Sequence, residues 1–388
     1  MSKRAEPMAD VAGTGDLLRT PLYDFHVANG ARMVAFASYE MPVQYPLGIL
    51  KEHLHTRSSA GLFDISHMGQ LSITAPGGHL DEAKRALEAV IPIDILGLPE
   101  GRQRYGFFTN DTGGILDDLM IANLGDRLVL IVNAARKSAD EAHLRQHLPG
   151  GIGIERIDSA LIALQGPKAA GALARLAPEC ESMRFMDVKT LKILGHDCLA
   201  SRSGYTGEDG FEISVPEEAA EAIARTLLGL AEVEAIGLGA RDSLRLEAGL
   251  CLHGSDIDET TTPVEARLTW AIPKVRRAGG ARAAGFPGAD IIMRQLHEGV
   301  SRLRVGLRPE GRAPVRGGVQ VYAREAGGEV IGHATSGGFG PSVGSPVAMG
   351  YVETSLSEPG TRLFAELRGK RLALDVAQLP FVPSGYKR

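Results

Sequence analysis

The C-terminal part of the chain contains short strand-like segments in close succession and almost no helical periodicity. Each segment is rich in apolar residues and is bounded by Gly, Pro or charged residues. A run of short strands without helices buries its apolar side chains either inside a small closed barrel or between two packed sheets. Both architectures are candidates for this part, whose strand-like segments are 304–307, 318–323, 329–336, 347–352, 363–367 and 371–376.

The preceding part of the chain mixes strands and helices. Residues 80–91 and 217–230 carry apolar side chains at helical spacing. The turn signal Asp-Thr-Gly-Gly at 111–114 joins two strand-like segments directly, as in a hairpin. We therefore predict an α+β fold rather than a doubly wound parallel sheet. The strand-like segments are 32–36, 70–74, 104–109, 115–121, 127–132, 160–164 and 211–215.

The composition changes between these two parts. Residues 274–288 carry several Lys and Arg among Ala, Gly and Pro, which is typical of an inter-domain linker or of a solvated basic loop. We therefore predict a linker at 276–298, between a large region at 20–275 and a C-terminal domain at 299–388. Residues 1–19 are expected to form a flexible tail.

Charge and composition exclude several classes of protein. The net charge is −5 with acidic and basic residues interleaved, so no basic stripe suited to a nucleic-acid backbone is visible. No apolar run approaches the ~18–20 residues of a membrane span. The three cysteines lack the spacing of a metal site, and the N-terminus lacks the apolar stretch of a signal peptide. We expect a cytoplasmic protein that binds neither nucleic acid nor membranes.

Glycine makes up 48 of the 388 residues, against a usual share of ~7%, and this surplus suggests a search for nucleotide-binding loops. The run from Gly337 to Gly344 lies between two predicted strands and has Pro341 where a phosphate-binding helix would begin. We expect this run to form a turn of the C-terminal domain. The histidines show no spacing that would hold a metal ion, so no metal cofactor is expected.

Two neighbouring carboxylates, Asp117 and Asp118, interrupt an apolar strand at 115–121. A carboxylate among apolar side chains is destabilised unless it meets a hydrogen-bond donor or a cation. At least one of the pair is therefore expected to face a polar cleft. The alternative is a strand end that exposes both side chains to water.

Further polar candidates lie downstream. Glu212 lies on the face of strand 211–215 opposite to the apolar side chains, where it contacts either solvent or a ligand. The three glycines within 203–210 would let a flat ligand approach the backbone closely. The segment 240–250 is helix-like, and in it Arg241 either pairs with Glu247 or a neighbouring strand, or offers its planar guanidinium to a ligand.

A series of short motifs extends from residue 20 to the C-terminus. They are Thr-Pro-Leu-Tyr-Asp-Phe-His at 20–26, Met-Pro-Val-Gln-Tyr at 41–45, His-Leu-His-Thr-Arg at 53–57, Leu-Phe-Asp-Ile-Ser-His-Met at 62–68, the segment 110–118, Ala-Leu-Gln-Gly-Pro at 163–167, the segments 204–210 and 240–249, and Pro-Phe-Val-Pro at 380–383. In this order they resemble the aminomethyltransferase (T protein) family of the glycine cleavage system. Each motif alone is weak, whereas the ordered set is specific.

The resemblance implies both a fold and a reaction. The fold would be a three-domain cloverleaf around a central hole that holds tetrahydrofolate, with two interleaved α+β subdomains and a C-terminal antiparallel β-barrel. The partner would be the lipoylated H protein, which carries an aminomethyl group on its dihydrolipoyl arm. The methylene would pass to tetrahydrofolate with release of ammonia, without a metal ion or a covalent nucleophile.

The resemblance also assigns residues by their positions in the motifs. Asp118 would be the catalytic carboxylate, which orients the folate and stabilises positive charge on the reacting nitrogens. Glu212 and Arg241 would hydrogen-bond the edge of the pterin ring, while Asp117 is expected to be structural. The implied aromatic contacts are Tyr105 and Tyr205 as walls of the hole, and Tyr386 as a substrate contact near the C-terminus.

Two other interpretations remain open within this resemblance. One is another tetrahydrofolate-dependent one-carbon enzyme, such as a demethylase, with the same folate site and a different donor. The other is a folate-binding protein of iron–sulfur assembly or tRNA modification. That branch has a Lys-Gly-Cys motif, where this chain has Gly249-Leu250-Cys251 instead.

Overall fold

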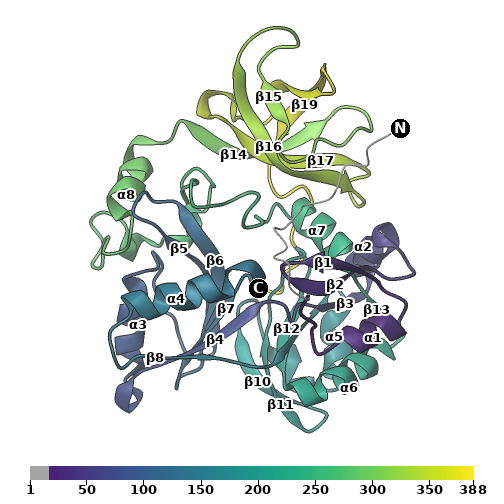
Figure 1. Ribbon diagram of the computed structural model, residues 1–388, viewed down its shortest axis with the longest axis vertical. Coiled ribbons are helices and arrows are strands. Elements are labelled where there is room, and N and C mark those ends of the chain that lie inside the picture. Colours follow the sequence, from purple (N-terminus) through teal and green to yellow (C-terminus); the bar gives the residue numbers. More distant parts are fainter. Residues whose placement is uncertain (1–16) are drawn as a thin grey trace.

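The three largest apolar cores organise the structure, a computed structural model that describes residues 17–388. Each of them belongs to one of three lobes, whose arrangement Figure 1 shows. The first lobe is built on a five-stranded sheet of order β5-β6-β7-β4-β8, in which all strand pairs are antiparallel. Its strands are β4 (Gly69–Thr74), β5 (Arg102–Thr109), β6 (Ile115–Asn123), β7 (Leu128–Val132) and β8 (Gly153–Arg156).

The second lobe contains a six-stranded sheet of order β10-β11-β12-β9-β3-β13. Only β13 runs parallel to its neighbour, β3. The strands of the first sheet lie between β3 and β9 in sequence, so that the first lobe is inserted into the second. The strands are β3 (Ala60–Asp64), β9 (Ala160–Gln165), β10 (Val188–Ile193), β11 (His196–Ser201), β12 (Gly210–Val215) and β13 (Val233–Ala235).

The third lobe is a closed barrel of six antiparallel strands, which confirms the predicted barrel and excludes the sandwich. Alternate side chains fill its interior, among them Val305, Val321 and Leu363, none more than 2% exposed. The strands are β14 (Arg302–Pro309), β15 (Gln320–Tyr322), β16 (Val330–Gly340), β17 (Ser345–Glu353), β18 (Arg362–Leu367) and β19 (Lys370–Ala377).

The expectation that the run from Gly337 to Gly344 forms a turn is wrong for its first half. Residues 337–340 belong to β16 and pair with β17. At Gly337 a Cβ atom would lie 1.8 Å from the carbonyl oxygen of Val315. Close approach of two backbone segments, rather than a turn, therefore requires glycine at this position.

Helices cover the sheets where their apolar stripes allow it. In α3 the buried side chains include Leu80, Ala83 and Leu87, the spacing expected from the sequence. Among residues 17–388, no helix is long and apolar enough to cross a membrane. The helices are α1 (Tyr23–Ala28), α2 (Ile49–Ser58), α3 (Leu80–Glu88), α4 (Lys137–His147), α5 (Ala169–Ala174), α6 (Glu217–Leu228), α7 (Leu238–Glu247) and α8 (Ala289–Glu298), and a β-hairpin, β1 (Arg32–Phe36) and β2 (Tyr39–Gln44), lies near α7.

Residues 276–298, expected to form a linker, are well packed. Arg276 and Arg282 form ion pairs with Glu88 of α3, at 3.2 and 2.9 Å. Helix α8 places Ile292 in the apolar core of the first lobe. A solvated basic loop is therefore wrong for this segment, because its charges meet a carboxylate that is only 4% exposed.

The predicted tail at 1–19 lies outside the described residues except for its last three. Within those, Leu18 forms an isolated bridge with Tyr39, and the Arg19 guanidinium lies 2.8 Å from the Glu40 carboxylate. Ordered contacts therefore begin before Thr20.

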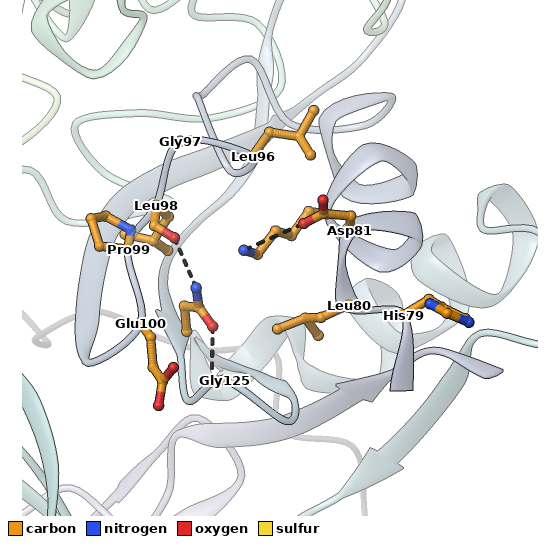
Figure 2. A pocket seen from close by; sticks show the side chains of 11 residues that line it. His79, Leu80, Asp81, Leu96, Gly97, Leu98, Pro99, Glu100 and Gly125 are labelled. Atoms are coloured by element: carbon orange, nitrogen blue, oxygen red, sulfur yellow. Dashed lines mark hydrogen bonds and ion pairs between the residues drawn. The ribbon is translucent and has the colours of Figure 1, made fainter. Parts of the chain in front are cut away.

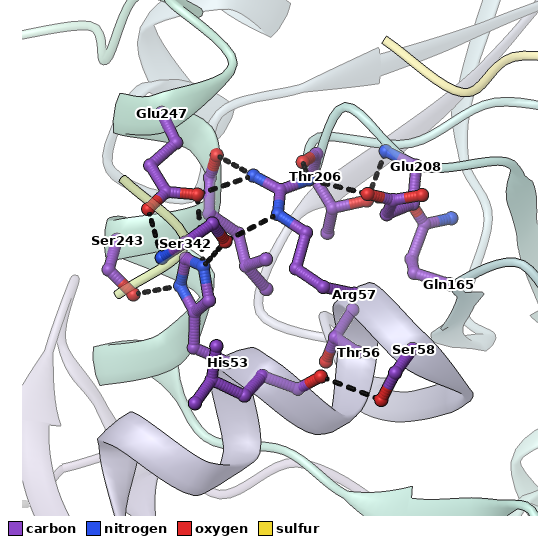
Figure 3. Close-up of polar contacts among 12 residues, drawn as sticks. His53, Thr56, Arg57, Ser58, Gln165, Thr206, Glu208, Ser243, Glu247 and Ser342 are labelled. Atoms are coloured by element: carbon purple, nitrogen blue, oxygen red, sulfur yellow. Dashed lines mark hydrogen bonds and ion pairs between the residues drawn. The ribbon is translucent and has the colours of Figure 1, made fainter. Parts of the chain in front are cut away.

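A buried carboxylate, Glu247 at the end of α7, joins the second lobe to the barrel (Figure 3). Its Oε2 lies 3.0 Å from His53 Nε2 and accepts a hydrogen bond from Arg57 Nη2 at 3.0 Å. Its Oε1 accepts the backbone N–H of Ser342, in the turn between β16 and β17, at 2.8 Å. The Glu247 carbonyl oxygen accepts the N–H of Phe381 at 2.9 Å. One residue thus connects α2, α7, the barrel hairpin and the C-terminal segment.

The Glu247 contacts predict an acid-dependent loss of stability. Burial alone would raise the pKa of Glu247, but the contacts with His53 and Ser342 outweigh it and lower the pKa from 4.5 to about 2. Because the folded pKa is the lower one, this stabilisation is complete above about pH 4.5 and is lost as the pH falls toward 2. Replacing Glu247 by Gln should lower the free energy of unfolding by about 3 kcal/mol at pH 7.

Denaturant unfolding at pH 7 and pH 3.5 measures this effect. The difference in stability between the two pH values should be smaller in Glu247→Gln than in the wild type. The exposed Glu218 of α6 provides the matched control, Glu218→Gln, which should behave like the wild type. An unchanged pH dependence in Glu247→Gln would contradict the assignment.

Candidate functional site

The six residues assigned from the sequence lie on different elements and are all partly exposed. Five come from the first two lobes and one from the segment that follows the barrel. This arrangement fits side chains that line a shared space rather than side chains of one core. They are Tyr105 on β5, Asp118 on β6, Tyr205 between β11 and β12, Glu212 on β12, Arg241 on α7 and Tyr386 near the C-terminus.

Asp118 is held by two donors, one on the neighbouring strand β5 and one directly after β7. The Tyr105 hydroxyl donates to Asp118 Oδ2 at 3.0 Å, and Asn133 Nδ2 donates to Oδ1 at 2.8 Å. Burial and the adjacent charge of Asp117 raise the pKa of Asp118 to about 6. The carboxyl group can therefore change protonation state near neutral pH, as a general acid or base must.

Arg241 and Glu212 lie in the same polar region without a direct ion pair. The Arg241 guanidinium carbon lies 4.8 Å from the centre of the Tyr205 ring. Glu212 accepts a hydrogen bond from the Ser203 hydroxyl at 3.1 Å. Burial lowers the pKa of Arg241 and raises that of Glu212. The opposite charge of the other residue partly offsets the effect of burial in both cases.

One nitrogen of this guanidinium, Arg241 Nη1, is buried and has no hydrogen-bond partner within residues 17–388. The expected ion pair of Arg241 with Glu247 is wrong, because the Glu247 carboxylate contacts His53 and Arg57 instead. A buried donor without a partner costs about 1–3 kcal/mol. Such a donor therefore indicates a ligand that supplies the acceptor.

Tyr386 is held in place by the second lobe. Its ring stacks on Phe185, with centroids 4.1 Å apart and planes 14° apart. On either side of it, Phe185 donates its N–H to the Lys387 carbonyl at 2.7 Å, and Gly385 donates to Gly207 at 2.8 Å. The last residues of the chain are thus tied to the second lobe.

Electrostatic effects connect these groups. Burial raises the pKa of Tyr205, and the charge of Asp118 raises it further. Burial likewise raises the pKa of Tyr386, with a contribution from Glu212. Charges influence one another in this way only over short distances. The printed contacts join Tyr105 to Asp118 and Arg241 to Tyr205, and the pKa effects relate Asp118 to Tyr205 and Glu212 to Tyr386.

Two further residues of this region were not identified from the sequence. Trp270 stacks on Tyr105, with ring centroids 5.3 Å apart, yet is 64% exposed. Asn133 holds Asp118 as described above. Both could have been proposed as candidates from the sequence, because Trp270 is the only tryptophan of the chain and Asn133 is a polar residue that directly follows the apolar strand β7.

The glycines near Tyr205 do not open space for a ligand, which corrects that expectation. A Cβ atom at Gly204 would lie 1.8 Å from Gln165 Oε1, and one at Gly210 would lie 2.3 Å from the Leu164 carbonyl oxygen. Strand β9 fills the space beside both residues. These glycines permit close packing within the protein.

The pocket in Figure 2 lies elsewhere in the first lobe. It has a volume of about 510 Å³ and is lined by residues that include Lys84, Leu98 and Glu100. Across it, Asn123 Nδ2 donates to the Leu98 carbonyl at 2.8 Å. None of the six assigned residues lines this pocket.

Comparison with known proteins gives a consistent result along the chain. Residues 22–276 match the GCVT N-terminal domain, and residues 302–383 match the glycine cleavage T-protein C-terminal barrel domain. The mitochondrial aminomethyltransferase of Mus musculus is 45% identical over 392 residues, covering 99% of this chain and 94% of that protein. That of Dictyostelium discoideum is 41% identical over 395 residues, covering 97% and 95%.

A solved structure shows the same similarity. The crystal structure of glycine cleavage system aminomethyltransferase T from Bartonella henselae superimposes with a TM-score of 0.89 at 47% sequence identity. The superposition covers 96% of this chain and 100% of that chain.

Proposed function

The chain belongs to the glycine cleavage T-protein family and is an aminomethyltransferase of the glycine cleavage system, and from this premise we propose how its residues serve the reaction. The co-substrate is tetrahydrofolate, and the aminomethyl donor is the S-aminomethyl-dihydrolipoyl arm of the H protein. The names of the relatives favour this activity over the demethylase and assembly-protein interpretations. Neither a metal ion nor a covalent nucleophile takes part.

The unpartnered Nη1 of Arg241 is the observation that carries the folate assignment. The 2-amino-4-oxo edge of a pterin presents acceptors beside donors. Arg241 would donate to the acceptors, and the Glu212 carboxylate would accept from the donors. Both residues are buried enough that their charges are penalised. Bound folate supplies the partners that they lack.

The three lobes would then form a cloverleaf around the folate. Tyr205, beside the Arg241 guanidinium, would pack against the pterin ring, and Tyr105 would line the wall next to Asp118. Tyr386 would close the site from the C-terminal segment, which the Glu247 contacts fix to the second lobe and the barrel.

Asp118 is the proposed catalytic carboxylate. In the reaction, the methylene exchanges its bonds to sulfur and to the amino nitrogen for bonds to N5 and N10 of the folate. The two protons that leave N5 and N10 end on the thiolate and on the departing ammonia. An ionised Asp118 would stabilise the positive charge that develops on these nitrogens, and would take and return a proton.

The relatives are named as mitochondrial proteins, and this name applies to them alone. A cytoplasmic location of this chain stays a prediction.

A direct assay tests the proposal. The protein is incubated with tetrahydrofolate and with H protein whose lipoyl arm carries the aminomethyl group. Ammonia and 5,10-methylenetetrahydrofolate should appear in equal amounts, and neither should form without tetrahydrofolate in the time of the assay. Formation of 5-methyltetrahydrofolate from a methylated donor, without any product from aminomethylated H protein, would support the demethylase instead.

Replacing Asp118 by Asn should reduce kcat by about 10²-fold or more, because the charge that stabilises the transition state is lost. Folate should still bind, because the amide keeps the shape of the side chain. In the wild type, kcat should rise with pH through about pH 6, where Asp118 ionises. Turnover by Asp118→Asn at the wild-type rate would exclude Asp118 as the catalytic group.

Replacing Glu212 or Arg241 by Ala should weaken tetrahydrofolate binding about 10-fold or more, because each change removes a charged hydrogen bond to the pterin. Quenching of Trp270, the only tryptophan, gives a binding signal. Arg316→Ala, at an exposed position of the barrel lobe, serves as the matched control. Wild-type affinity in both site variants would place the pterin elsewhere.

A further inference from the structure

Asp117, expected to be structural, lies at the centre of a buried polar cluster behind Asp118. Both Asp117 oxygens accept hydrogen bonds from Asn133, Oδ2 from its backbone N–H at 3.1 Å and Oδ1 from Nδ2 at 2.9 Å. The same Nδ2 donates to Asp118 Oδ1 at 2.8 Å. One side-chain amide thus holds the two neighbouring carboxyl groups in fixed orientations.

A third carboxyl group, Asp140 of α4, completes the cluster. Asp117 is fully buried and Asp140 is 1% exposed. Asp140 Oδ2 is buried and has no N–H or hydroxyl donor in the described part of the chain, and its carboxyl group interacts with the side chain of Asp117. Two neighbouring carboxylates repel each other, whereas a proton between them forms a hydrogen bond.

We propose that Asp117 and Asp140 share one proton and that, together with Asn133, they act as positioning residues that fix Asp118 and set the negative charge that it faces. This inference rests on the proposed catalytic function of Asp118. It assigns to Asp117 and Asp140 an effect on the reaction, although neither touches the substrate.

Three other titratable or charged groups face the cluster. His253 Nδ1, from the segment after α7, lies 3.7 Å from Asp117 Oδ1, and its Nε2 is buried without a partner in the described structure. Arg136, next to α4, favours the ionised form of Asp140 and lowers its pKa against the effect of burial. Tyr105 faces Asp118 from β5.

The pKa directions agree with a single shared proton. Burial and the contact with Asp140 raise the pKa of Asp117 to about 8. Burial raises the pKa of Asp140 to about 6. Near pH 7 the pair therefore keeps one proton and one negative charge. This charge is part of what raises the pKa of Asp118.

The test compares pH profiles of kcat in two isosteric variants. Asp117→Asn leaves the single negative charge of the pair on Asp140 instead of on the residue adjacent to Asp118, so the midpoint of the acid limb should fall by about one pH unit. Asp140→Asn leaves Asp117 fully ionised beside Asp118, so the midpoint should rise by about half a pH unit. The KM for tetrahydrofolate should stay within about twofold in both variants, because neither residue meets the folate.

Opposite shifts support the proposal, because a purely structural defect would lower kcat without moving the midpoint in two directions. A wild-type midpoint in Asp117→Asn, or shifts of the same sign in both variants, would overturn it. If Asp117→Asn does not fold, the direction of the Asp140→Asn shift decides alone. Asp111→Asn, an exposed position in the β5–β6 turn, is the control.

The Asp118→Asn variant separates this inference from the function on which it rests. If Asp118→Asn retains activity, the catalytic assignment itself fails. If Asp118→Asn is inactive while the Asp117 and Asp140 variants keep the wild-type midpoint, only the shared-proton pair fails.

Discussion

The contacts of Glu247 are the interaction on which the arrangement of the lobes depends. Its side chain binds His53 and Arg57 of α2 and the N–H of Ser342 in the barrel hairpin, and its carbonyl holds the C-terminal segment. Glu247 ends the same helix that carries Arg241. The helix that presents a guanidinium to the site is thus fixed at its other end to the barrel. Because the buried Glu247 carboxylate needs all of these donors, it favours a single relative position of α2, α7 and the barrel hairpin.

The site consequently depends on distant parts of the sequence. Asp118 and Tyr105 come from an antiparallel pair in the first lobe, whereas Glu212 and Arg241 come from the second. Tyr386 reaches the region only after the chain has completed the barrel. No single lobe holds all of these groups. The proposed transfer of a methylene from the arm of another protein to a folate suits walls from several lobes, since both partners must enter and leave.

Much of the fold followed from local patterns, because strands and amphipathic helices are specified by nearby residues. The barrel strands and the β5–β6 hairpin were predicted in this way. The resemblance supplied Asp118, Glu212 and Arg241, whose motifs are continuous in sequence. It did not supply Asn133, because its contact with Asp118 arises only when β7 pairs with β6. The packing of 276–298 was missed for the same reason, since its partner Glu88 lies far away in sequence.

Burial has opposite consequences for the carboxylates of this protein, and the difference separates their functions. Glu247 is surrounded by donors, so its pKa falls although it is buried. Glu212 receives one hydroxyl donor and Asp118 two neutral donors, so their pKa values rise. A charge that the protein satisfies fully stabilises the fold, whereas a charge that it leaves incompletely satisfied retains free energy for a ligand or a transition state. By this criterion Glu247 stabilises the fold, while Asp118 and Glu212 have the properties that their proposed roles in the site require. Asp117 lies between these two cases, because Asn133 donates to both of its oxygens and it also shares a proton with the carboxyl group of Asp140, which has no donor for Oδ2.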